Sequence, residues 1–401
     1  MESPSNQTTL SFSPFKTGLA FRPFFWLGSA YLIVAMLVWL SFWRGNAPLQ
    51  PLGGMVWWHQ HEMLFGFVCA IVAGFLLTAV QTWTGLPSVK GLALGGVVSL
   101  WLAARVLLAF PMGIDPSWLA VLDVAFLPVV ALILANRVTR AKKWRNVVFV
   151  PVLFTLAGAN FAMHWGQWHG NPSLVKASAH LTIWLVVMLI VLLGGRVIPF
   201  FTSRALKVTL DPVPSYYEKP ALISTVLICL FMLAQLLGMP SPTGLLSLLL
   251  GVLIIANTAR LIRWQPLRCW RHPLLWGLHL SYAFIIVGAL LWLFHLWQAI
   301  SLDLAVHALT IGSMLAIILA MMARVSLGHT GRTMKALPGL SAALLCLFVA
   351  AVIRSLLPLW WPQWTLAAYQ LSLALCLLAF SWFLVHYTVP LWSARVDQRP
   401  G

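Results

Sequence analysis

The sequence predicts an all-α protein, a polytopic membrane bundle of about twelve transmembrane helices. Composition is the first reason: 61% of the residues are hydrophobic and only 8% are charged, whereas soluble domains contain about 25% charged residues. The second is that apolar runs long enough to cross a hydrocarbon core of about 30 Å recur from Pro23 to Trp392. We therefore expect a single transmembrane domain at 23–392, between cytoplasmic tails at 1–22 and 393–401.

Hydropathy places the individual helices between short loops, so sequential neighbours should pack antiparallel. The first apolar run is too long for a signal-peptide core and lacks a small-residue cleavage site, so we expect it to be retained. The predicted helices are 23–43, 57–82, 89–110, 117–135, 147–166, 174–197, 220–238, 243–262, 273–297, 301–324, 337–357 and 364–390.

Basic residues in alternate connections predict the orientation. Lys90, Arg204 and Arg332 stand in three of these connections, while the opposite connections hold little beyond Arg44 and Asp115. By the positive-inside rule both ends of this multi-pass protein are cytoplasmic. The basic cytoplasmic loops, which orient the protein in the lipid bilayer, then explain the formal charge of +17. Nothing in the sequence indicates a nucleic-acid partner.

The spacing of three histidines is compatible with a threefold repeat of four helices. His61, His180 and His307 follow the aromatic–arginine pairs at 21–22, 144–145 and 270–271 by 39, 35 and 36 residues. Regular helix lengths would impose such a period by themselves. They would not place a histidine at one depth in predicted helices 2, 6 and 10, roughly 6 to 9 Å below the outer interface.

These histidines are candidate ligands for a metal or a heme, because neutral imidazole is the commonest transition-metal ligand and polar groups inside a bilayer are costly. An interhelical hydrogen-bonding role is the alternative for any one of them. Helix 2 adds His59 and Glu62, which share a face at i, i+3, while His61 points elsewhere. Two sites, or one ligand with its supporting shell, both fit this pattern.

Other polar residues are secondary candidates. His164 lies at the outer edge, and His279 and His329 lie nearer the inner face. Arg196 and Arg324 lie in segments 194–202 and 324–332, which we interpret as tight basic turns that anchor to lipid phosphates or clamp heme propionates. Intramembrane carboxylates are few: Glu62, Asp123 and Asp303.

Segments 58–67, 194–202 and 326–332 resemble the hallmark segments of the NnrS family, and the likeness covers nearly the whole chain. The resemblance implies an inner-membrane protein that contains heme and copper and is associated with denitrification and nitric oxide stress.

A looser likeness is to the catalytic subunit of heme-copper oxidases, which has ligand histidines on helices 2, 6 and 10. By this analogy His61 and His307 would be axial ligands of a heme, and His180, with His59, would bind copper. The sequence departs from that pattern, since helix 7 has no adjacent histidine pair and helix 10 has a single histidine.

The leading hypothesis is thus a heme- and copper-binding membrane protein that binds or converts nitric oxide, with an electron donor that the sequence does not identify. A secondary transporter of a small anion or metal ion is the alternative, because twelve spans without visible catalytic machinery are typical of transporters. A membrane scaffold or sensor is a third interpretation, against which the intramembrane histidines argue.

Overall fold

A computed structural model describes residues 18–46 and 49–397. Within these residues all regular structure is helical, and no strand is present. Twelve helical spans are long and apolar enough to cross a membrane, which confirms the predicted multi-pass helical bundle. Parts of both predicted tails, residues 1–17 and 398–401, lie outside the described residues.

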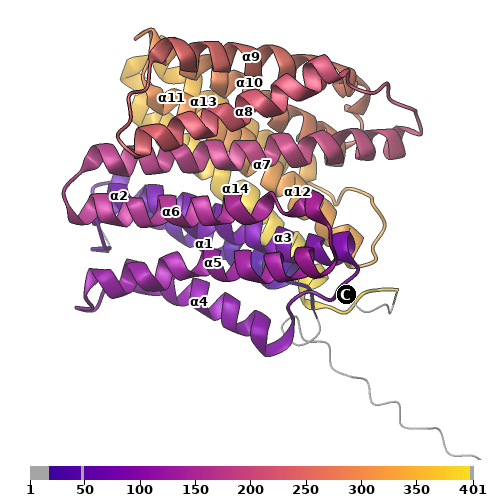
Figure 1. Cartoon of the computed structure of the whole chain (residues 1–401), viewed down its shortest axis with the longest axis horizontal. Coiled ribbons are helices and arrows are strands. Elements are labelled where there is room, and N and C mark those ends of the chain that lie inside the picture. The colour runs from indigo at the N-terminus through magenta and orange to yellow at the C-terminus, as the bar shows by residue number, and fades with distance from the viewer. Residues whose placement is uncertain (1–17, 47–48, 398–401) are drawn as a thin grey trace, which may run out of the picture.

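Most of the helix axes run in roughly the same direction (Figure 1). Ten spans are built on one α-helix each, and the second and tenth combine α-helical and π-helical segments. The single helices are α1 (Phe21–Trp43), α4 (Gly91–Ala109), α5 (Pro116–Arg140), α6 (Phe149–Trp168), α7 (Pro172–Leu206), α8 (Ser215–Leu236), α9 (Thr243–Arg263), α10 (Pro273–Leu296), α13 (Leu340–Trp360) and α14 (Thr365–Trp392). The second span is α2 (Gly54–His61), η1 (Glu62–Val68) and α3 (Cys69–Thr84), and the tenth is α11 (Leu302–His307), η4 (Ala308–Leu315) and α12 (Ala316–His329).

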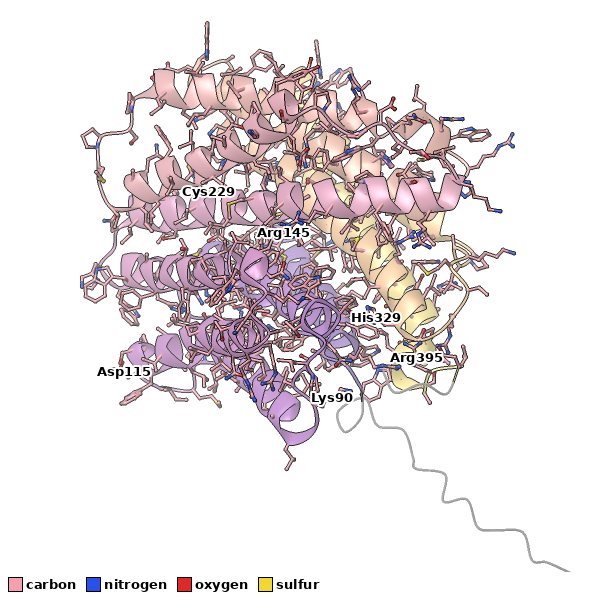
Figure 2. All side chains as sticks on the ribbon, turned by 45° about the vertical axis from the view of Figure 1, so that its right-hand side comes forward. Lys90, Asp115, Arg145, Cys229, His329 and Arg395 are labelled. Carbon is pink, nitrogen blue, oxygen red and sulfur yellow. The ribbon has the colours of Figure 1, made fainter. Side chains whose placement is uncertain are left out.

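The two ends of the described chain meet at one end of the bundle, as an even number of spans requires. Arg22, at the start of α1, donates from Nη1 to the carbonyl oxygens of Leu391 and Ser393, at 2.9 and 2.7 Å. Figure 2 shows Lys90 and Arg395 toward this side and Asp115 at the opposite one. We call these the terminal end and the distal end.

The predicted turn at 194–202 is wrong, because α7 continues through Pro199 to Leu206. A bilayer offers no water to the backbone groups that a broken helix would expose, so helices tend to continue across a proline. Beyond the proline, Thr202 donates from Oγ1 to the carbonyl of Ile198 at 2.9 Å, a bond within the continuing helix. The predicted turn at 324–332 is also wrong over its first six residues, because α12 continues past Arg324 to His329.

Glycines allow close approach where the π-helical segments pack. The segments η1 and η4 directly follow His61 and His307, and π-helical turns often occur at functional sites. A Cβ added at Gly312, in η4, would collide with the ring of Phe284 on α10. A Cβ added at Gly66, in η1, would lie 2.9 Å from the Arg105 guanidinium. Both positions therefore require glycine.

We predict that Gly312→Ala destabilises the bundle by about 1 to 3 kcal/mol, because the added methyl overpacks the contact with Phe284. The matched control is Gly251→Ala in α9, where an added Cβ meets nothing within 4 Å and the change should be neutral or gain up to about 1 kcal/mol of helix propensity. Thermal unfolding in one detergent measures both. Equal melting temperatures for the two variants would contradict the packing argument.

Candidate metal centre

Five of the first six helical spans contribute charged or hydrogen-bonding side chains to one buried cluster. Each of these side chains, Tyr31 apart, belongs to a residue no more than 3% exposed. We call the group the Arg105 cluster, and its members are Tyr31 of α1, His61 and Glu62 of the second span, Arg105 of α4, Asp123 of α5, and Asn160 and His164 of α6.

Arg105 bridges the two carboxylates of the cluster. Its Nη1 donates to Glu62 Oε2 at 2.6 Å, and its Nη2 forms an ion pair with Asp123 Oδ1. The Tyr31 hydroxyl donates to the same oxygen of Glu62. Two ionised carboxylates facing one guanidinium leave one unit of negative charge in excess. Burial of an unbalanced charge is costly, so this site favours one further positive charge.

Both ring nitrogens of His61 face hydrogen-bond acceptors. Nδ1 lies 3.0 Å from Glu62 Oε1, and Nε2 lies 2.8 Å from Asn160 Oδ1 and 3.0 Å from Asp123 Oδ2. Asn160 donates from Nδ2 to Asp123 Oδ2 at 2.7 Å. If the Asn160 amide were turned around, its oxygen would face the carboxylate oxygen of Asp123, and both are acceptors. A neutral imidazole has one donor, so the surroundings of His61 call for a second proton or a bound cation.

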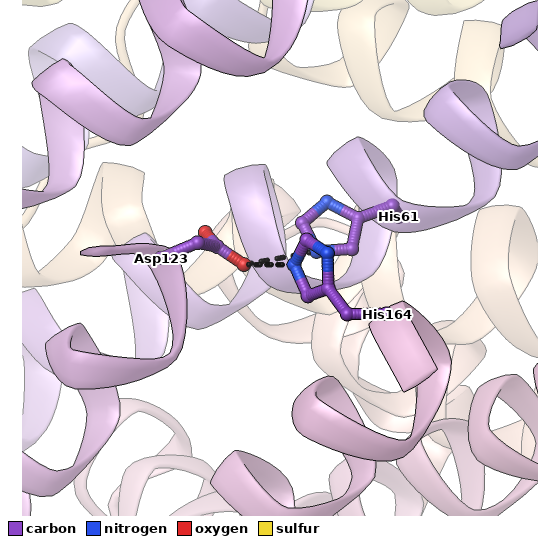
Figure 3. A group of neighbouring side chains, drawn as sticks. All are labelled: His61, Asp123 and His164. Atoms are coloured by element: carbon purple, nitrogen blue, oxygen red, sulfur yellow. Dashed lines mark hydrogen bonds and ion pairs between the residues drawn. The ribbon is translucent and has the colours of Figure 1, made fainter. Parts of the chain in front are cut away.

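His164 completes a metal-like arrangement (Figure 3). Its Nε2 lies 3.1 Å from the same Asp123 Oδ2 that His61 approaches, and its Nδ1 is buried without a hydrogen-bond partner among the described residues. One donor atom from each of His61, Asp123 and His164 lies within 4.8 Å of the others. Two imidazoles and one carboxylate are a common ligand set for transition metals. Glu62 on Nδ1 of His61 is the partner that usually orients a ligand histidine.

A second polar group, which we call the Asp303 cluster, lies toward the distal end. His307 Nδ1 lies 2.8 Å from the backbone oxygen and 3.0 Å from Oδ1 of Asp303, and Arg354 donates to Asp303 Oδ2 at 2.7 Å. His59 stacks on Trp39 with ring centroids 4.1 Å apart, and it lies within electrostatic range of Asp303 and His307. Its Nδ1 is buried and has no hydrogen-bond partner within the described chain. Tyr369 also donates to Asp303 Oδ2, at 3.2 Å.

The structure thus distributes the histidines of helix 2 between two clusters. His59 and Glu62, which we predicted on one face, are separated: Glu62 hydrogen-bonds to His61 and to Arg105. The reason is that Arg105, on another helix, draws the Glu62 carboxylate into its ion pair. That His61 and His307 share a heme stays a prediction, and each has its own hydrogen-bond partners.

The remaining candidates lie outside both clusters. His180 packs its ring 5.2 Å from that of Trp292, and His279 places Nδ1 3.0 Å from the carbonyl oxygen of Leu275. The ring of His329 lies 5.5 Å from that of Phe21. Arg324 covers the Phe201 ring at 3.5 Å, and Arg196 is half-buried on α7.

Comparison with known proteins identifies the family. The family model described as NnrS protein matches residues 17–395, nearly the whole chain. The chain belongs to the NnrS family. The resemblance predicted from the sequence motifs is confirmed, and membership indicates a membrane protein of the nitric oxide response. The family is linked to metal and heme binding. No curated protein matches the chain.

The sequence analysis missed four members of the Arg105 cluster of this NnrS-family chain. Tyr31, Arg105 and Asn160 received no role, and Asp123 was noted only as a rare intramembrane carboxylate. The sequence did carry a signal for Arg105 and Asp123, because an ionisable residue inside an apolar span is a functional candidate by default. Pairing Arg105 with Asp123 and Glu62 needed the packing of three helices.

We predict effects of very different size on the stability of the metal-free protein from two substitutions in the Arg105 cluster. Arg105→Met leaves two buried carboxylates without their cation and should cost about 3 to 5 kcal/mol of stability. Glu62→Gln removes the excess negative charge and should be far less harmful. Thermal unfolding in detergent measures both, with Arg140→Met at the exposed end of α5 as control. A larger loss for Glu62→Gln than for Arg105→Met would contradict the charge count.

Proposed function

We propose that this chain is a heme- and copper-binding protein of the bacterial inner membrane, acting in denitrification or the response to nitric oxide. Its transition-metal ion would be held by His61 Nε2, His164 Nε2 and an oxygen of Asp123. The observation that carries the proposal is the convergence of these three buried groups in a cluster that has one negative charge in excess.

The chemistry of the donor set favours a transition metal over other cations. Na⁺, Mg²⁺ and Ca²⁺ prefer shells made of oxygen, whereas imidazole suits copper, zinc and iron. Among divalent first-row ions copper binds such nitrogen and oxygen sites most tightly. Three protein ligands leave open a coordination position, at which a bound metal could take a small ligand such as nitric oxide.

The residues around this position would hold the ligands in place. Glu62 fixes the ring of His61 through Nδ1, and Arg105 holds both carboxylates. Trp57 stacks on His61 with ring centroids 4.7 Å apart, and its ring lies 5.1 Å from that of His164. This indole shields the two imidazoles, so water access to the proposed metal is restricted.

The Asp303 cluster supports the heme part of the proposal. Asp303 engages His307 Nδ1, so Nε2 of His307 would be free to hold a heme iron. We propose His59 as its partner on the same heme, because His59 belongs to the same cluster and its Nδ1 is unpaired there. His61 is the alternative partner that the sequence analysis predicted.

The metal site is tested by elemental analysis of purified protein loaded with copper and then washed. We expect about one copper per chain in the wild type and loss of most of it in His164→Ala and Asp123→Asn, because a two-ligand site binds far more weakly. His169→Ala, an exposed histidine five residues farther along the chain, should retain the metal.

A wild-type protein that retains no more copper than His164→Ala would overturn the metal site, and the missing positive charge would then come from a proton on His61. The thermal melt of each variant separates ligand loss from misfolding. Accumulation of a small anion or metal ion in liposomes by a protein free of both cofactors would favour transport instead.

The heme site is tested by absorption spectra of the purified protein. We expect a Soret band that weakens severalfold in His307→Ala and His59→Ala, since loss of an axial ligand weakens heme retention, and that persists in His272→Ala, an exposed loop variant. Loss in His61→Ala rather than His59→Ala would restore the predicted pairing of His61 with His307. Full bands in His307→Ala and His61→Ala would exclude both pairings.

A further inference from the structure

An apolar cavity of about 110 Å³ lies where the second, sixth and tenth spans meet. Its walls come from residues 68–76, 186–198 and 314–322, with Phe25 of α1 and Leu278 of α10 filling the sides. Every lining side chain is a hydrocarbon or a methionine thioether. Neither cluster described above contributes to its walls.

The cavity has a regular position relative to the three predicted ligand histidines. Its lining begins at Val68, Val186 and Met314, which follow His61, His180 and His307 by 7, 6 and 7 residues (68 − 61, 186 − 180, 314 − 307). At 1.5 Å per residue this offset is about 10 Å along each helix. The cavity therefore lies one layer farther toward the terminal end than these histidines, among the same three spans.

Most of the lining is buried in the protein interior: Val186, Leu189 and Ile198 are each less than 5% exposed. The half-buried lining residues lie toward the terminal end of each lining segment, and they are Val72, Phe75, Leu193, Val197 and Met321. The cavity is therefore open at that side. A small molecule would enter from that side.

We propose that this cavity binds small uncharged apolar molecules of the size of a diatomic gas. A chamber without polar groups cannot satisfy the hydrogen bonds of water, and apolar cavities of about 150 Å³ in proteins stay dry and take up xenon or benzene. Dispersion contacts from closely spaced side chains then favour an occupant that fills the space. Nitric oxide belongs to this class of molecule. The proposed gas binding does not depend on the metal site or the heme site proposed above.

The test uses xenon as the probe, with the full chain in lipid nanodiscs and ¹²⁹Xe NMR as the measurement. We expect a saturable shift in the wild type and an affinity at least about tenfold weaker in Val186→Phe/Ile318→Phe, which fills the cavity from two walls. The matched control is Val226→Phe/Ile255→Phe, the same two changes at positions 42% and 67% exposed to lipid. The control should bind xenon as the wild type does.

Folding is checked on the same samples by thermal unfolding, and filling an empty cavity should leave the melting temperature unchanged or raise it. Absence of saturable xenon binding in the wild type, or equal binding in both double variants, overturns the proposal. So does a tightly held acyl chain recovered by lipid extraction from the wild type and the control but not from the cavity-filled variant. If the double variant alone unfolds, crystals of the wild type and of the single variant Ile318→Phe are pressurised with xenon instead. Xenon in the cavity of the wild type and less of it in Ile318→Phe supports the proposal, and equal occupancy or none in the wild type overturns it.

Discussion

The ion pairs of Arg105 are the interaction on which the candidate site depends. One guanidinium holds Glu62 and Asp123, which come from different helices, and these carboxylates position His61 and His164. Inside a bilayer no water compensates a broken contact, so each member is fixed by the others. Because water is absent, the negative charge of the second carboxylate, which Arg105 does not balance, is not screened by solvent either. The cluster is thus held in place by its own contacts and favours one further positive charge.

Close helix packing at glycines lets the polar cluster form without voids. Gly66 leaves room for the side chains of Glu62 and Arg105, and Gly312 does the same for Phe284. Each glycine lies in a π-helical segment directly after a histidine. The wider π-helical turn shifts the register of the side chains along the helix. Toward the distal end these two spans carry the polar contacts of His61, Glu62 and His307, and toward the terminal end they line the apolar cavity.

The three spans that surround the cavity are related in position but differ in chemistry. The second and tenth carry histidines with carboxylate partners, followed by π-helical segments, whereas α7 is continuous and its His180 contacts Trp292. The offsets of the cavity lining from the three histidines agree to within one residue. This agreement supports the predicted repeat in geometry, while the ionisable partners of the histidines follow no threefold pattern.

The sequence by itself determined the membrane class, the number of spans, the family and the helices that carry histidines, because hydropathy and motifs are local properties of the chain. It also singled out His61 and Glu62 as candidates, and both lie in the Arg105 cluster. Only the tertiary structure decided their partners: Arg105, Asp123 and Asn160 come from three other helices, and no local pattern encodes how helices rotate against one another. The course of α7 through Pro199 was likewise decided by its surroundings, since in a bilayer a continuous helix satisfies its backbone where a turn does not.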